Sequence, residues 1–423
     1  MKPLLVTGLQ WGDEGKGKFI DFLGKKFDAT VRFNGGNNAG HTVVYNKTTL
    51  HLSLIPSSIL HKKTVLISQA VIINPQFLLK EIKLFKKLKI NPKLGIDPRC
   101  HIVMPYHQAL DSASEEYKGK KKTGSLKLGI GFCYEDRTNR AGIRLIDLIN
   151  PHQLRKKINA VWNLKQKRIT RAYKSKFNLN KETTIKQYQQ YGKLLKPYLK
   201  NVTDFVNQNI NKKSFLFESA QGAYLDFAFG TYPYTVAYHT TSASALTSIG
   251  LPPMKINVLG IVKAYTTRVG NGPFPTELTN KINNHLRSIG HEYGTVSKRP
   301  RRCGWLDLVL IKQAININGV NSIALTKLDV LSGLKQLKIC THYTLNNKTI
   351  RQLPLSFSDT SKLKPQYTTL PGWSKNISQI KKFSHLPKTC QKYINFIGKK
   401  IKIPLKYISV GPDRNQTIIS LND

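Results

Sequence analysis

Residues 8–18 read Gly-Leu-Gln-Trp-Gly-Asp-Glu-Gly-Lys-Gly-Lys and directly follow the apolar run Pro3–Thr7. Within this stretch, Gly12 to Lys18 match the pattern Gly-x4-Gly-Lys. In that pattern the backbone N–H groups of a glycine-rich loop, together with a lysine, hold the phosphates of a nucleoside triphosphate. The stretch therefore predicts a strand, a phosphate-binding loop and a helix, in that order.

The loop differs from an ordinary phosphate loop in two respects. Phe19 stands where a Ser or Thr usually follows the lysine to hold Mg²⁺, and an acidic pair, Asp13-Glu14, lies inside the loop. A carboxylate so close to bound phosphates costs Coulomb energy unless a cation binds it or it accepts a substrate proton. We therefore expect phosphate binding combined with acid–base or metal chemistry; the alternative is a plain glycine-rich turn.

A second glycine-rich segment follows the short strand-like run Val31–Phe33. Residues 34–42 read Asn-Gly-Gly-Asn-Asn-Ala-Gly-His-Thr. Gly and Asn tolerate positive φ, so the segment is expected to form a tight loop with many free backbone donors. His41 is a candidate catalytic residue because its proton is mobile near neutral pH, although a lone histidine is more often structural.

A third signal lies far downstream, where an apolar strand-like run ends in Thr326-Lys-Leu-Asp329. The pattern Thr-Lys-x-Asp resembles the guanine-reading element of GTP-binding proteins, in which the carboxylate accepts hydrogen bonds from guanine N1–H and N2–H₂. Adenine offers no such pair of donors, so the aspartate would be left buried and unpaired with the wrong base. Together with the phosphate loop, this element favours GTP over ATP.

In combination, these segments resemble the adenylosuccinate synthetase family, and the likeness runs essentially from end to end. The matching segments are Gln10–Lys18, Gly35–Thr42, Tyr134–Asp136, Ala220–Gly222, Gly230–Tyr234, Lys263–Glu277, Gly304–Asp307, Leu325–Leu331 and Gly411–Arg414. The family joins IMP to L-aspartate with hydrolysis of GTP, on the way to AMP. The resemblance implies a GTP-dependent ligase that works as a cytoplasmic homodimer.

Strand-like and helix-like runs alternate along the chain. Expected strands are 4–7, 30–33, 64–67, 101–104, 214–218, 258–263, 322–326 and 407–410; expected helices are 16–23, 75–88, 108–117, 151–162, 181–209 and 306–317; residues 335–353 are expected to form a surface hairpin. This alternation predicts an α/β fold, with a large, mainly parallel central sheet covered by helices and P-loop-like GTP-binding features. The chain shows no linker or repeat, so residues 1–423 are expected to form a single large domain.

The formal net charge of +44 is extreme for an enzyme. It is compatible with nucleic-acid binding, but the lysines are spread along the whole chain beside Asn and Ile, which favours compositional drift in an AT-rich genome. We expect no specific nucleic-acid partner.

No apolar run approaches the ~18 residues of a membrane span, and no secretory signal is evident. Five scattered cysteines without a Cys-x-x-Cys pair favour reduced thiols and a cytoplasmic location.

The resemblance also implies roles for individual residues. Asp13 would be the base that deprotonates IMP and, with the carbonyl of Gly40, a ligand of the cofactor Mg²⁺; His41 would be the acid, with Lys16 and Gln221 completing the catalytic set. The implied GTP site comprises Gly12, Asp13, Glu14, Gly15, Lys16, Gly17, Lys18, Gly40, His41, Thr42, Arg301, Lys327, Leu328, Asp329, Ser409, Val410 and Gly411. The implied IMP site comprises Asp13, Glu14, Gly15, Lys16, Asn38, Ala39, Gly40, His41, Leu126, Arg140, Gln221, Val236 and Arg299. Arg140 would cross the dimer interface to the partner's IMP phosphate.

Three departures from the family pattern fall in these sites. Leu126 and Val236 replace threonines expected at the IMP phosphate, with Ser125 and Thr235 beside them. The implied aspartate-binding loop consists of Thr295, Val296, Ser297, Lys298, Arg299, Pro300 and Arg301, in which Val-Ser-Lys replaces the usual Thr-Thr-Gly. Each lost hydroxyl corresponds to about 1 kcal/mol of binding. We therefore expect lowered substrate affinity with the reaction retained.

Two rival functions fit the sequence less well. A GTPase switch protein would keep a Ser or Thr after the phosphate-loop lysine, and Phe19 argues against it. A catalytically weakened homologue acting as a basic nucleic-acid-binding protein would have no need of Asp13, His41, Lys327 or Asp329, all of which are intact.

Overall fold

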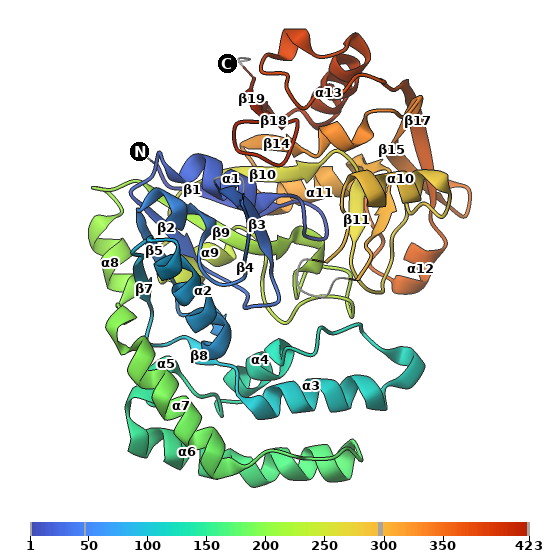
Figure 1. The fold of residues 1–423 in the computed structure, drawn as a ribbon. Coiled ribbons are helices and arrows are strands. Elements are labelled where there is room, and N and C mark those ends of the chain that lie inside the picture. Colours follow the sequence, from blue (N-terminus) through green and yellow to red (C-terminus); the bar gives the residue numbers. More distant parts are fainter. Residues whose placement is uncertain (1, 46–47, 295–298, 421–423) are drawn as a thin grey trace.

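A computed structural model describes residues 2–45, 48–294 and 299–420. Over these residues, nine strands form one central sheet (Figure 1). In spatial order they are β19 (Thr417–Ile419), β18 (Leu405–Ser409), β14 (Ser322–Thr326), β10 (Asn257–Lys263), β1 (Leu4–Gly8), β9 (Phe215–Gly222), β2 (Ala29–Arg32), β5 (Thr64–Ile67) and β7 (Lys93–Ile96). All neighbours pair in parallel except β18 and β19. The expected α/β fold with a mainly parallel sheet is confirmed.

The remaining elements surround or extend this sheet. The helices are α1 (Lys16–Gly24), α2 (Pro75–Lys87), α3 (Pro105–Tyr117), α4 (Ile130–Thr138), α5 (Leu145–Ile149), α6 (Pro151–Lys167), α7 (Lys181–Leu195), α8 (Val202–Asn209), α9 (Ser244–Ile249), α10 (Lys281–Ile289), α11 (Leu308–Asn318), α12 (Phe357–Ser361) and α13 (Lys388–Ile401). The strands outside the central sheet are β3 (His41–Tyr45), β4 (Thr48–Leu52), β6 (Ile72–Ile73), β8 (His101–Ile102), β11 (Thr266–Arg268), β12 (Arg302–Gly304), β13 (Leu306–Asp307), β15 (Gln336–Leu345), β16 (Lys348–Ile350) and β17 (Lys364–Pro371). The organisation of the chain as a single domain stays a prediction.

Strand β1 lies in the interior of the sheet, between β10 and β9. Its neighbouring residues Leu5 and Val6 are both fully buried and point to opposite faces. Val6 packs with Phe19 and Ile20 of α1, whereas Leu5 belongs to the larger core that includes α11. A strand covered by helices on both faces has to be apolar throughout, which is why Pro3–Thr7 reads as a continuous apolar run.

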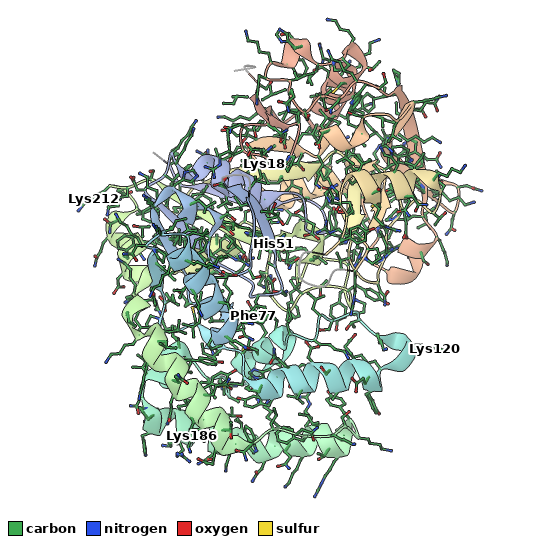
Figure 2. The ribbon with its side chains drawn as sticks, viewed as in Figure 1. Lys18, His51, Phe77, Lys120, Lys186 and Lys212 are labelled. Carbon is green, nitrogen blue, oxygen red and sulfur yellow. The ribbon has the colours of Figure 1, made fainter. Side chains whose placement is uncertain are left out.

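The helices α3 to α7 gather beyond the β7 edge of the sheet, in the lower part of Figure 1. The apolar faces of α3, α5, α6 and α7 share a core with α2 and with strands β5 and β7, whereas the buried apolar residues of α4 belong to a separate cluster around Tyr238. On the opposite side, α13 and the antiparallel pair β15–β17 pack beside the C-terminal strands. The surface carries the excess positive charge on widely separated elements, as the outward-pointing Lys120, Lys186 and Lys212 show (Figure 2).

Several sequence-based boundaries differ from the observed ones. The strand expected at 101–104 is reduced to β8, which pairs with β6 outside the central sheet. The helix expected over 181–209 is divided at Pro197, because proline has no N–H to donate and prevents the residue before it from continuing the helix. A new helix, α8, then starts where Asn201 caps it through the N–H of Asp204.

Two further differences have local causes. Asp307 accepts the N–H groups of Val309 and Leu310 and thereby starts α11 later than expected, after the short strand β13. Strand β7 was not expected, because Lys93 and Gly95 are uncommon in strands; it lies at the edge of the sheet, where such residues are tolerated. The hairpin is confirmed: Asn346 and Asn347 both have positive φ between β15 and β16.

Candidate active site

A cavity of about 1070 Å³ lies where the parallel strands end. Loops that follow β1, β2, β9, β14 and β18 all contribute to its lining, so it sits at the carboxyl edge of the sheet, where α/β proteins bind ligands. The lining includes the following residues expected from the sequence: Asp13, Gly15, Lys16, Gly17, Lys18, Asn38, Ala39, Gly40, His41, Thr42, Leu126, Gln221, Val236, Arg301, Lys327, Asp329, Ser409 and Gly411. Segments far apart in the sequence therefore meet around one space.

The other expected site residues lie outside this lining. Gly12, Glu14, Leu328 and Val410 support it from behind: each is buried and adjacent in the chain to a lining residue. Arg140 and Arg299 are exposed and do not line the cavity. In the expected aspartate loop, Thr295, Val296, Ser297 and Lys298 lie outside the described residues.

The phosphate loop has the strained backbone that its glycines make possible. Gly12 and Gly15 have φ of 85° and 98°, and Asp13 between them has φ of 58°. Gly15 is the N-cap residue of α1, and the first residues of this helix, Lys16 to Lys18, line the cavity. Because helix N-terminal N–H groups carry partial positive charge, the loop suits an anion such as phosphate.

The two acidic residues of the loop have different environments. The Glu14 carboxylate is fully buried and accepts the N–H groups of Gln10 (3.1 Å) and Gly12 (2.8 Å). It also lies 2.6 Å from Nζ of Lys16. The Glu14 carboxylate therefore holds the two ends of the loop together and orients the Lys16 side chain. Asp13 instead exposes 28% of its side chain within the cavity. Of the pair, Asp13 is therefore the carboxylate that a ligand can reach.

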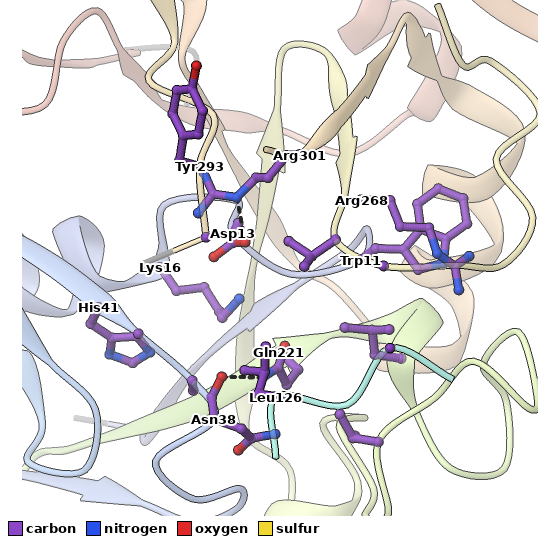
Figure 3. A pocket seen from close by; sticks show the side chains of 18 of the residues that line it. Trp11, Asp13, Lys16, Asn38, His41, Leu126, Gln221, Arg268, Tyr293 and Arg301 are labelled. Atoms are coloured by element: carbon purple, nitrogen blue, oxygen red, sulfur yellow. Dashed lines mark hydrogen bonds and ion pairs between the residues drawn. The ribbon is translucent and has the colours of Figure 1, made fainter. Parts of the chain in front are cut away.

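Asp13 is approached from the other side of the cavity by Arg301 (Figure 3). Nε of Arg301 donates to Oδ2 of Asp13 over 2.7 Å, and its Nη1 donates to Oε2 of Glu292 over 2.6 Å. The guanidinium therefore bridges a fully buried carboxylate and one that faces the cavity. Burial lowers the pKa of Arg301, but the charges of Asp13 and Glu292 outweigh that effect and raise it, so Arg301 is a permanent cation here.

His41 follows the second glycine-rich loop at the start of β3. Its Nδ1 lies 2.6 Å from Oε1 of Glu218, a fully buried residue on β9. Burial lowers the pKa of His41, while the Glu218 carboxylate opposes that effect. Nε2 of His41 has no hydrogen-bond partner among the described residues. One side of the ring is thus oriented by Glu218, and the other is left for a ligand of the cavity.

Gln221 and Asn38 meet on the opposite wall. Gln221, at the end of β9, has φ of 68°, and its Nε2 donates weakly to the carbonyl of Asn38 over 3.5 Å. The Asn38 amide in turn donates to Tyr238 Oη over 3.3 Å. Two amides with remaining donors and acceptors can recognise the polar edge of a base.

The Thr-Lys-x-Asp element lies at the far end of the cavity. Lys327 has φ of 59°, and its Nζ donates to the carbonyl of Gly290 over 2.6 Å. Oδ1 of Asp329 is buried without a hydrogen-bond partner among the described residues, and burial raises the pKa of this carboxyl. A buried carboxylate that lines a cavity and lacks a partner is suited to a ligand that brings its own N–H donors.

Lys18 contacts the protein itself instead of pointing freely into the cavity. Its Nζ donates to Ser409 Oγ (2.6 Å) and to the carbonyls of Gly411 (2.7 Å) and Gln416 (2.9 Å). Ser409 ends β18, and Gly411 and Gln416 belong to the loop between β18 and β19. Lys18 therefore fastens that loop to α1 beside Asp329.

The wall expected at a nucleotide monophosphate is partly apolar. Leu126 and Val236 line the cavity, and Val236 packs with Leu128 against a buried cluster around Tyr238. The neighbouring Ser125 and Thr235 line the same wall. The departures identified in the sequence thus face the space that a substrate would occupy.

Three residues in or beside the cavity were not expected from the sequence: Glu218, Arg268 and Glu292. Arg268 lines the cavity, lies 5.0 Å from the centre of the Trp11 ring and is 1% exposed; its burial lowers the pKa of the guanidinium to about 9. Arg268 falls in the long family-like segment Lys263–Glu277, and that resemblance is the signal that could have pointed to it. Glu218 and Glu292 carry no local motif that would have singled them out.

The residues expected to hold Mg²⁺ fit that ion in part. Asp13 offers a carboxylate oxygen to the cavity, and Gly40, whose carbonyl was the second expected ligand, lines the same space. Among the described residues, no group of three or more His, Cys, Asp or Glu side chains is arranged to hold a metal. Mg²⁺ commonly takes one or two protein carboxylates and completes its shell with water and substrate phosphates. The cavity suits that mode of binding.

The fold and the cavity together define a nucleotide-binding α/β enzyme whose phosphate loop carries a carboxylate. The family model of adenylosuccinate synthetase matches residues 5–418. The adenylosuccinate synthetase of Desulforamulus reducens is 44% identical over 423 residues, covering 99% of each chain. Adenylosuccinate synthetase 1 of Photorhabdus laumondii is 44% identical over 415 residues, covering 98% of this chain and 99% of that protein. The chain belongs to the adenylosuccinate synthetase family, and its expected nature as a GTP-binding ligase of purine biosynthesis is confirmed.

Solved structures agree with this assignment. The structure of fully ligated adenylosuccinate synthetase from Plasmodium falciparum has a TM-score of 0.93 and 37% identity, covering 99% of this chain and 100% of that one. The succinoaminodeoxyadenylate synthetase of cyanophage S-2L shares the fold, with a TM-score of 0.63 at 19% identity. Over the residues described, no helix combines the length and apolar character required to cross a membrane.

Proposed function

We propose that this protein joins IMP to L-aspartate at the expense of GTP, releasing GDP and phosphate and forming adenylosuccinate through a 6-phosphoryl-IMP intermediate. The observation that carries the proposal is the placement of Asp13 in one cavity with His41, Gln221 and the unpartnered carboxylate of Asp329. One cavity thereby offers a base, an acid and a guanine-binding carboxylate.

In the first step, Asp13 accepts the proton from N1 of IMP, which makes the 6-oxygen nucleophilic. That oxygen attacks the γ-phosphorus of GTP; a P–O bond forms and the bond to GDP breaks. His41, aligned by Glu218 and protonated on both ring nitrogens, donates a hydrogen bond from Nε2 to the developing negative charge on the transferred phosphoryl group. Lys16 and the N–H groups at the start of α1 hold the phosphates.

In the second step, the amine of L-aspartate attacks C6 of the phosphorylated purine. The C6–O bond breaks, phosphate leaves, and the proton lost by the amine nitrogen goes to the departing phosphate. Arg299 and Arg301 are the residues proposed to hold the aspartate carboxylates, since a guanidinium can bind a carboxylate through two parallel hydrogen bonds. Mg²⁺, held by Asp13 and the Gly40 carbonyl, would neutralise charge on the GTP phosphates.

GTP specificity is assigned to Asp329 and Lys327, with Ser409 to Gly411 packing against the base. The Asp329 carboxylate would accept N1–H and N2–H₂ of guanine, which supplies the partners that the buried oxygen lacks. Lys18 holds the loop that contains Ser409 and Gly411. It would therefore support the guanine site from behind.

We also propose a cytoplasmic homodimer in which Arg140 reaches the IMP phosphate of its partner. Arg140 is exposed just beyond α4 and does not line the cavity of its own subunit, which is compatible with a role in the site of a partner. Activity per subunit should then fall on dilution and recover at high IMP concentration. All five cysteines are buried free thiols, which agrees with a reducing compartment.

The decisive experiment incubates the purified protein with IMP, L-aspartate, GTP and Mg²⁺ and follows adenylosuccinate by chromatography. We expect equal amounts of GDP and adenylosuccinate, with no product when any one substrate is omitted. ATP should not replace GTP. Release of phosphate from GTP without adenylosuccinate would show that the assignment is wrong.

A further inference from the structure

We propose that Glu292 is a positioning residue that holds two substrate-binding cations, Arg301 and Lys327, in place at once. The proposal rests on the function proposed above and assigns a task to a residue that does not line the cavity. One buried carboxylate would thereby link the catalytic carboxylate at one end of the site with the guanine-binding end.

Glu292 is fully buried, and its carboxylate is surrounded by donors from separate parts of the chain. Oε2 accepts from Nη1 of Arg301 over 2.6 Å. Oε1 accepts from Nζ of Lys263 over 3.0 Å, bonds the hydroxyl of Tyr265 and lies 3.9 Å from Nζ of Lys327. Burial would raise the pKa of Glu292, but Lys263, Lys327 and Arg301 together lower it to about 2. The group is therefore an anion at every working pH.

Arg301 and Lys327 connect the Glu292 carboxylate to the two ends of the cavity. Arg301 uses its Nε to bind Asp13, so one end of its guanidinium is fixed by a buried group and the other faces the cavity. Lys327 donates to the carbonyl of Gly290, two residues before Glu292. The short segment from Gly290 to Glu292 therefore orients Lys327 through a backbone carbonyl and through charge.

Removing the charge of Glu292 would leave three cations around a neutral group. In a buried setting they would repel one another, and the remaining anions nearby are Asp13 and Asp329. Arg301 and Lys327 would shift toward these carboxylates, which are the groups proposed to meet IMP and guanine. Loss of Glu292 should therefore weaken nucleotide binding at positions that Glu292 itself does not touch.

The experiment compares Glu292→Gln with the wild-type protein by calorimetric binding of GDP and by steady-state kinetics. Glutamine keeps the shape and one acceptor but removes the charge. We expect the Kd of GDP and the KM for GTP to rise roughly tenfold. The matched control is Asp307→Asn, which also removes a buried carboxyl but has no contact with the cavity. It should lower the melting temperature without changing either constant.

Double variants show whether Glu292 acts through its two partners. If Glu292 acts through Lys327, adding Glu292→Gln to Lys327→Gln should not raise the Kd of GDP further. If it acts through Arg301, adding Glu292→Gln to Arg301→Gln should not raise the KM for aspartate further. Fully additive effects, or an unchanged Kd of GDP in a folded Glu292→Gln protein, would overturn the proposal. The binding of GDP is measured without turnover, so a failure of the proposed reaction would be seen separately, as absence of adenylosuccinate in the wild-type protein.

Discussion

Nδ1 of His41 lies 2.6 Å from Oε1 of Glu218, and both side chains are buried. Nη1 of Arg32 lies 3.6 Å from the same carboxylate oxygen, so Glu218 keeps its negative charge although it is buried. This arrangement favours the tautomer in which Nδ1 carries the proton and faces Glu218. When His41 takes a second proton, that proton is on Nε2, which has no hydrogen-bond partner among the described residues.

Glu218→Gln should lower kcat by roughly 10²-fold or more, because the ring would lose its orientation and the positive charge on His41 would lose its partner. The KM values for IMP and GTP should change much less. The control is His41→Asn, and the double variant should be no slower than His41→Asn alone. A Glu218→Gln protein with wild-type kcat would show that Glu218 serves only the packing of β9.

Asp13→Asn should abolish turnover while leaving GTP binding largely in place, because the change removes the base and keeps the shape. A general base contributes about 10²- to 10⁴-fold to the rate. The measurement pairs kcat with the Kd of GTP from calorimetry. More than about a tenth of wild-type kcat in this variant would rule out Asp13 as the base.

Asp329→Asn should reduce kcat/KM for GTP by about ten- to a hundredfold, which is the cost of losing a hydrogen bond to a charged group. The amide replaces one acceptor by a donor, which opposes guanine but suits the 2-oxo group of xanthine. Kinetics with XTP should therefore show a gain in the variant. Unchanged selectivity for GTP would count against the assignment of Asp329 to the base.

The titration of the buried Asp307 carboxyl should make the stability of the protein depend on pH. Burial raises the pKa of this carboxyl to about 7, although Tyr343 and the N–H groups at the start of α11 favour its charged form. The unfolded chain releases the same proton near its usual pKa of about 3.9. Between these pH values the folded state holds a proton that the unfolded state lacks. The contribution of Asp307 to the free energy of unfolding therefore falls as the pH rises toward 7.

Asp307→Asn removes this pH dependence. The free energy of unfolding of the variant should therefore rise relative to that of the wild-type protein as the pH rises from about 5 to 8. Urea unfolding at several pH values measures the difference. Tyr343→Phe is the matched control, because it removes the hydroxyl contact and keeps the titrating carboxyl. Parallel stability profiles for the wild-type protein and Asp307→Asn would contradict the expectation.

The parts of the site that the sequence predicted are those with local constraints. The loop Gly12–Lys18 and the element Thr326–Asp329 each carry their chemistry within a few residues, and both line the cavity. Glu292 could not be predicted in this way, because its role depends on Lys263 and Lys327, which only the folded chain brings to it. A single acidic residue in a sequence says nothing of the cations that will surround it.

The fold shows the same division between local and distant causes. The buried run Pro3–Thr7 predicts the interior strand β1 because both faces of that strand must be apolar. The strand β7 was missed because Lys93 and Gly95 are uncommon in strands; they are tolerated here because β7 lies at the edge of the sheet, beside β5. Lys18 has the position of a phosphate-binding lysine in the motif, yet its ammonium binds a loop contributed by the C-terminal part of the chain.

Leu126→Thr should lower the KM for IMP several-fold, with little change in kcat or in the KM for GTP. Leu126 and Val236 offer no side-chain hydrogen bond to the phosphate of IMP, so a hydroxyl at 126 would restore about 1 kcal/mol of binding. Binding energy regained away from the reacting atoms lowers KM without raising kcat. Steady-state kinetics with IMP as the varied substrate measures the effect.

Ser125 offers the test of the alternative, in which a neighbouring hydroxyl already fills this role. Ser125 lines the cavity beside Leu126, and its Oγ accepts the N–H of Lys127 over 3.2 Å, which leaves its own O–H free to donate to a phosphate. If Ser125 serves the phosphate, Ser125→Ala should raise the KM for IMP and Leu126→Thr should leave it unchanged. If the site is weakened as its apolar wall indicates, Ser125→Ala should have little effect and Leu126→Thr should tighten binding.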